Sequence, residues 1–121
     1  WYQKAAAQGD AGSHTDLGLM YLEGKGVAQD DKKAVEHIER AAKMGSPEAQ
    51  RLLGRMYLEG KGVDKDYAQA YIWNAVAVAN GNFDAQAGLD ASRENLSPAA
   101  LEEADGRARK YFEQYRYKPQ I

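Results

Sequence analysis

The sequence has no cysteine, only two histidines and no long apolar run. The lack of cysteine excludes disulfide frameworks, thiol nucleophiles and cysteine-based zinc sites, and it suits the cytosol and the periplasm alike. No stretch approaches the roughly 18 apolar residues that a membrane-spanning helix requires, so we expect no membrane insertion. The formal net charge is −2 and no basic block occurs, which argues against a nucleic-acid partner.

Motifs for catalysis are also missing. Gly60-Lys61-Gly62 follows a predicted helix rather than a strand, and glycine stands where a phosphate-binding loop has Ser or Thr after its lysine. No serine has a lysine three residues later, as a penicillin-recognising enzyme would need. His14 and His37 are too few for a histidine-based metal site. The sequence therefore predicts no catalytic residues, no metal and no cofactor.

The most informative feature is an internal repeat with a period of 36 residues. Residues 21–27 recur letter for letter at residues 57–63, and a weaker third copy fades after Leu89. Self-similarity at such a period is typical of a solenoid, in which each unit buries its apolar face against the next. The chain starts at Trp1 without Met, within what reads as the end of a helix. We therefore expect a processing boundary there, with room for further repeats before it.

Each copy is predicted to form two antiparallel helices, which makes the fold all-α. In the second copy Ala49, Leu53 and Met56 fall on one helical face. A second helix is expected over residues 66–80, with Asp66 as its N-cap. Ser46 precedes a proline, which is the usual start of a helix. The Gly-Lys-Gly segments let the chain reverse direction between the two helices.

A divergent third pair of helices is expected over residues 83–95 and 98–115, with Ser97 as the cap of the last helix. The extra charge on that helix suits a terminal element whose outer side faces water. We read the chain as one repeat domain with four parts. These are the end of a preceding helix at 1–8, repeat 1 at 9–44, repeat 2 at 45–80, and the third pair with its C-terminal capping helix at 81–121.

Two glycines lie inside predicted helices. Gly18 and Gly54 each cost about 1 kcal/mol relative to alanine at such a position. We expect the paired helix to approach closely there, under an aromatic side chain such as Trp73.

Aromatic residues are concentrated near the C-terminus. Tyr111 and Tyr115 share one helical face and are expected to pack on the preceding helix. Phe112, Arg116 and Tyr117 remain as candidate contacts for a partner.

The repeat resembles the Sel1-like repeat, a tetratricopeptide-related family. The residues that carry the resemblance are Ala49-Gln50, Leu53-Gly54, Met56-Tyr57, Gly60, Gly62-Val63, Asp66, Ala70 and Trp73. The resemblance covers nearly the whole chain and implies a right-handed superhelix of helical hairpins that serves as a scaffold or adaptor in protein complexes, most often in bacteria. The first copy departs from the pattern, with Ser13-His14 in place of Ala-Gln and Asp16 in place of a leucine. Its first helix is therefore expected to pack less well.

The strongest candidate site is the concave groove, because stacked hairpins line their inner surface with the first helix of each pair. Removing the packing residues leaves a set of nine positions on these helices. They are Thr15, Leu19, Leu22, Arg51, Arg55, Leu58, Ala87, Ala91 and Glu94. Two arginines beside leucines suit a strip that binds a partner's peptide or helix, although an ordinary solvated surface accounts for the same residues.

Two other functions stay open at this point. A hydrolase or small-ligand protein would use His14 with nearby carboxylates such as Asp16, although an interhelical or surface hydrogen bond explains His14 equally simply. His37 shares the register of Trp1 and Trp73, which predicts a packed imidazole. The third alternative is a structural end-cap of a longer repeat array. The partner protein and the oligomeric state are not encoded in any of these patterns.

Overall fold

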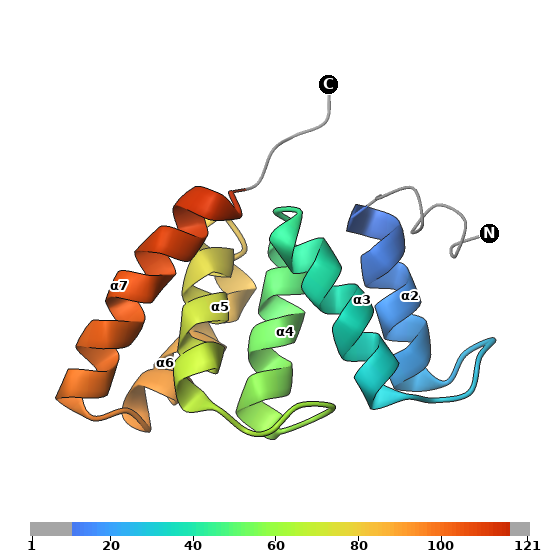
Figure 1. Ribbon diagram of the computed structural model, residues 1–121, viewed down its shortest axis with the longest axis horizontal. Helices are drawn as coiled ribbons and strands as arrows, with labels where there is room; N and C mark the ends of the chain where they lie inside the picture. Colours follow the sequence, from blue (N-terminus) through green and yellow to red (C-terminus); the bar gives the residue numbers. More distant parts are fainter. Residues whose placement is uncertain (1–10, 117–121) are drawn as a thin grey trace.

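The helices predicted from the sequence form where their start signals lie. The computed structural model describes residues 11–116, and this part of the chain contains α-helices, one short 3-10 helix and no strand (Figure 1). The helix predicted at residues 1–8 lies outside the described residues. The elements in chain order are α2 (Ala11–Glu23), α3 (Asp31–Lys43), α4 (Pro47–Glu59), α5 (Tyr67–Ala79), η1 (Phe83–Ala85), α6 (Gln86–Glu94) and α7 (Pro98–Gln114).

Side-chain caps explain where the helices begin. The Ser46 hydroxyl accepts a hydrogen bond from the Ala49 backbone N–H at 3.2 Å, and Asp66 accepts one from Gln69 at 3.1 Å. Ser97 caps α7 in the same way. These bonds satisfy backbone donors that have no partner inside the first turn. The predicted starts of α4, α5 and α7 are thereby confirmed.

The helices stack as antiparallel hairpins, as in an α-solenoid. Helix α2 packs on α3, α4 packs on α5, and α3 joins the two hairpins by packing on α4. Figure 1 shows α2 to α5 side by side in one row, with α7 beyond α5. The last two helices differ from the expected hairpin, because α6 and α7 both pack chiefly on α5. None of the helices between residues 11 and 116 combines the length and apolar character needed to cross a bilayer.

Helix α7 is held on α5 by an aromatic cluster. The Trp73 ring lies 5.3 Å from the Tyr111 ring and 5.7 Å from the Tyr115 ring, measured between centroids. At the other end of α7, the Tyr71 hydroxyl donates a hydrogen bond to the Asp105 carboxylate. Tyr111 and Tyr115 do pack inward, as predicted, but on α5 and not on α6, the helix that precedes α7.

The two glycines inside helices do mark close approaches, but Trp73 is not the residue that meets them. A Cβ atom on Gly54 would lie 2.6 Å from Asn74 Nδ2, and one on Gly18 would lie 2.5 Å from Ile38 Cγ1. Trp73 directly precedes Asn74 on α5, and its ring contacts Tyr111 of α7 instead. The prediction was therefore right about close packing and wrong about the side chain.

Candidate partner-binding groove

Two adjoining hollows open between the first helices of successive hairpins. The first, about 190 Å³, lies between α2 and α4. The second, about 270 Å³, lies between α4 and α6. Arg55 lines both hollows, so they meet across α4. We call the combined surface the groove; its residues are Leu19, Leu22, Glu23, Leu52, Arg55, Met56, Glu59 and Lys61 around the first hollow, and Arg51, Arg55, Leu58, Asn74, Asp84, Ala87 and Gly88 around the second.

Most of the predicted groove residues come together here. Leu19, Leu22, Arg51, Arg55, Leu58 and Ala87 line one hollow or both. Ala91 is half-buried and Glu94 is exposed, and neither lines these hollows. Thr15 is only 3% exposed, so its side chain is not available to a partner in this structure. Ser13 and His14 are buried as well, and three successive residues span more than half of a helix's circumference, so burial at this level of α2 is not confined to one face.

The two arginines of α4 differ in their ion pairing. Arg55 Nε lies 3.4 Å from Glu59 Oε1, one helical turn later, and both side chains are largely exposed. Such a pair contributes only a few tenths of a kcal/mol, so a partner's acceptor can readily replace the glutamate. Arg51 is half-buried and forms no ion pair with any carboxylate of residues 11–116. The groove therefore presents cationic donors beside leucine side chains.

The floor of the second hollow holds a residue that the sequence did not single out. Asn74 belongs to α5 but reaches between α4 and α6, where Gly54 and Gly88 leave room for its side chain. It is only 2% exposed, and its Nδ2 donates to the Ala70 carbonyl at 2.8 Å. Comparison of the repeat copies could have found Asn74, because a polar residue stands there at the position where the first copy has the apolar Ile38.

The two histidines form a contact between α2 and α3. Their Nδ1 atoms are 3.2 Å apart, and the Tyr21 ring stacks on His37 with centroids 5.7 Å apart. His14 is 4% exposed, so the polar start of α2 is buried in this structure. Burial lowers the pKa of His37, and the neighbouring His14 lowers it further. The two imidazoles thus form an interhelical hydrogen bond. This agrees with the interpretation of His14 as a structural residue.

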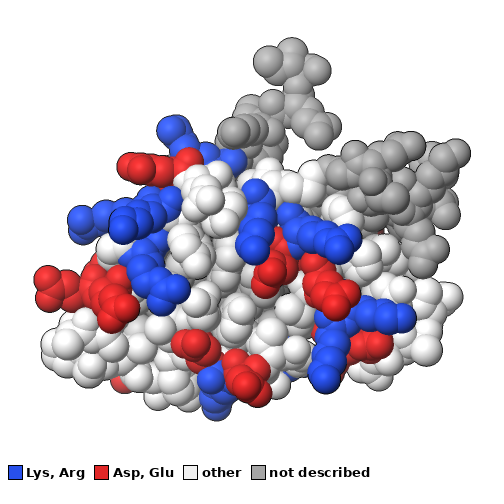
Figure 2. Space-filling view, viewed as in Figure 1, with Lys and Arg blue, Asp and Glu red and all other residues white. Residues whose placement is uncertain are grey.

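Among the described residues, no three His, Asp or Glu side chains gather in a way that could hold a metal ion. The acidic and basic side chains are intermingled on the face shown in Figure 2. Nucleic-acid binding needs basic residues gathered on one face, and this face does not offer them.

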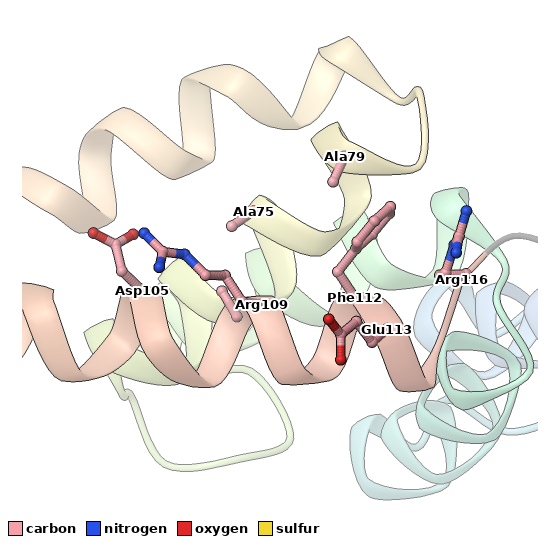
Figure 3. Close-up of a pocket in the computed structure, with 8 residues that line it drawn as sticks. Ala75, Ala79, Asp105, Arg109, Phe112, Glu113 and Arg116 are labelled. Carbon is pink, nitrogen blue, oxygen red and sulfur yellow. The ribbon is translucent and has the colours of Figure 1, made fainter.

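A further hollow of about 490 Å³ lies between α5 and α7 (Figure 3). Phe112 points into it beside Ala79, and the Arg116 guanidinium lies 5.4 Å from the centre of the Phe112 ring. These are two of the predicted contact residues of the aromatic tail; the third, Tyr117, lies outside the described residues. Arg109 and Glu113 line the same hollow.

The comparisons with known proteins agree on one family. The model of the Sel1 repeat matches residues 1–10, 11–46 and 47–82. Among solved structures, a protective antigen of uropathogenic Escherichia coli strains that displays an SLR fold matches 100% of this chain, with a TM-score of 0.93 and 31% sequence identity. This chain spans only 28% of that antigen. A Sel1 repeat protein from Oxalobacter formigenes matches 74% of this chain and 68% of its own length, with a TM-score of 0.72 and 41% identity. No curated protein matches the sequence at a significant level.

Proposed function

We propose that this chain, which belongs to the Sel1 repeat family, binds a segment of a partner protein in its groove. Sel1 repeat proteins are generally protein–protein interaction modules and are typically non-enzymatic scaffolds. The observation that carries the proposal is the position of Arg55, which lines both hollows and joins the surfaces of α2, α4 and α6.

The chemistry of the groove supports a peptide ligand. Leu19 and Leu22 in the first hollow and Leu58 in the second are half-buried, so each keeps apolar surface for a partner to cover. Arg55 lines both hollows and Arg51 lines the second, and both provide donors for carbonyl or carboxylate oxygens. Arginine is among the residues that contribute most to protein interfaces. The groove runs across three helices, which suits an extended or helical segment.

A charge-reversal experiment tests this function. The wild-type chain is used to capture its partner from the native host, and the recovered protein is identified by mass spectrometry. The double variant Arg51→Glu with Arg55→Glu should recover that partner at least tenfold less well, because it replaces both donors by acceptors. Unchanged recovery would show that the groove is not the binding surface.

The matched control is Arg107→Glu with Lys110→Glu on α7. Both of these side chains are exposed and neither lines a groove hollow. The control makes the same change in net charge and should retain the partner. Circular dichroism of both double variants should show the helix content of the wild type.

A further inference from the structure

The two hollows of the groove are built differently at equivalent repeat positions. Asn74 follows Ile38 by one period of 36 residues, and Gly88 follows Leu52 by the same interval. Ile38 on α3 and Leu52 on α4 belong to one buried apolar cluster, and Leu52 also borders the first hollow. Asn74 on α5 and Gly88 on α6 line the second hollow. Two neighbouring positions thus differ together, with two apolar side chains in one place and an amide beside a glycine in the other.

The orientation of the Asn74 amide follows from its one hydrogen bond. The Ala70 carbonyl can only accept, so the atom 2.8 Å from it is the Nδ2 donor. Oδ1 is then on the side of Gly88, where a Cβ atom would lie only 2.8 Å from it. Within residues 11–116 no group donates a hydrogen bond to Oδ1. The sequence therefore places a polar side chain where the other copy has isoleucine, and the acceptor that no described protein group uses lies at a hollow that a ligand can enter.

The hollow has the size and lining for one side chain. Its volume of about 270 Å³ is below the roughly 300–1,000 Å³ of small-molecule sites. Leu58 and Ala87 form apolar walls, Arg51 provides donors, Asn74 provides a neutral acceptor, and the exposed Asp84 adds a carboxylate. The two arginines outnumber Asp84 and disfavour a lysine, and a ligand carboxylate would place an oxygen against Oδ1 in a hollow that already holds Asp84. A carboxamide has both an N–H for Asn74 and a carbonyl for Arg51.

Resting on the proposed groove function, we propose that Asn74 selects a glutamine or asparagine side chain of the partner segment. The amide N–H of that side chain donates to Asn74 Oδ1, and its carbonyl accepts from Arg51. Leu58 and Ala87 cover its methylene groups. The second hollow is therefore the specificity pocket of the groove, and the first hollow adds apolar contact.

The test uses a library of random twelve-residue peptides displayed on phage. Peptides are selected on the wild-type chain, and those that still bind Arg51→Glu with Arg55→Glu are discarded. The remaining groove peptides should share a Gln or Asn at one position, and changing it to Glu should weaken binding at least tenfold. The variant Asn74→Leu, which keeps a similar shape but has no acceptor, should also bind at least tenfold more weakly. It should no longer distinguish the Gln peptide from the Glu peptide.

The outcomes separate this inference from the function on which it rests. Groove peptides that lack a carboxamide anchor, or that bind Asn74→Leu as tightly as the wild type, would overturn the role of Asn74 and leave the groove intact. A selection that yields no groove-dependent peptide would overturn both.

A second measurement uses the wild-type chain alone, so its result does not depend on whether a variant folds. The side-chain amide resonances of Asn74 should shift on saturation with a selected Gln peptide, and unmoved resonances contradict the inference.

Discussion

The side-chain amide of Gln50 donates a hydrogen bond to the backbone carbonyl of Tyr115, 65 residues later in the chain, at 2.9 Å. The same Nε2 donates to the Ala42 carbonyl at 3.0 Å, and Oε1 accepts from Asn80 Nδ2 at 2.8 Å. Gln50 is fully buried on α4, so one side chain connects the ends of α3, α5 and α7. The last helix is therefore anchored to the middle of the repeat array by a polar contact as well as by Trp73.

We expect Gln50→Leu to lower the free energy of unfolding by about 2–4 kcal/mol, because it removes several hydrogen bonds and leaves buried partners without one. Urea unfolding followed by circular dichroism measures the change. Gln86→Leu is the matched control, since the Gln86 side chain is exposed on α6 and, within residues 11–116, bonds to Asp90 alone. That control should change stability by less than about 0.5 kcal/mol. Equal losses in the two variants would contradict the role of Gln50.

Glycine-to-alanine changes at Gly54 and Gly106 should have opposite signs. A Cβ on Gly54 meets Asn74, whose amide is held by Ala70, so Gly54→Ala should cost about 1–3 kcal/mol by overpacking. Apart from the adjoining residues and backbone of α7 itself, no described atom lies within 4 Å of a Cβ on Gly106, and alanine should add up to about 1 kcal/mol through helix propensity. Thermal unfolding of both variants checks this. A stabilised Gly54→Ala would show that the two helices are not in close contact.

The stability of the chain should depend on the protonation of His37. Burial lowers its pKa below the ordinary 6.5, His14 and Arg40 lower it further, and Glu36 opposes them. The folded chain therefore holds this proton less tightly than the unfolded chain does. Stability should be complete above about pH 6.5 and should fall as the pH drops through 6.5 toward the lower folded pKa. Urea midpoints from pH 8 to pH 5 should decline less in His37→Gln than in the wild type; parallel curves would refute this.

The cap of α5 should contribute measurably to stability. Asp66→Ala removes the acceptor for the Gln69 backbone N–H and should cost about 1 kcal/mol. Asp64→Ala removes the same charge two residues earlier, at an exposed position before the helix, and should have little effect. Chemical unfolding of the two variants separates the cap from the change in net charge. If Asp64→Ala is as costly as Asp66→Ala, the effect is electrostatic and not capping.

Local signals were sufficient for the helices and for much of the groove. The Ser46 and Asp66 caps and the spacing of apolar residues act within a few residues along the chain, and the repeat period is visible in the sequence itself, so all three can be read without tertiary contacts. The period also aligned Arg51 and Arg55 with positions on a first helix, and both arginines do line the groove. Thr15, which the period aligns with Arg51, is buried, because the first copy does not expose the same part of its first helix as the second copy does.

The sequence by itself determined the family and the helical hairpins, because both depend on the repeat. Tertiary structure alone decided that α6 and α7 share α5 as their packing partner, that His14 meets His37, and that Asn74 reaches the floor of the groove. The physical reason is that these contacts depend on the rotation of each helix about its own axis. Small residues at the helix–helix contacts set how closely the helices pack and so affect that rotation. Helix rotation is set by the whole array of contacts, such as Gly54 and Gly88 closing on Asn74, and no short segment encodes it.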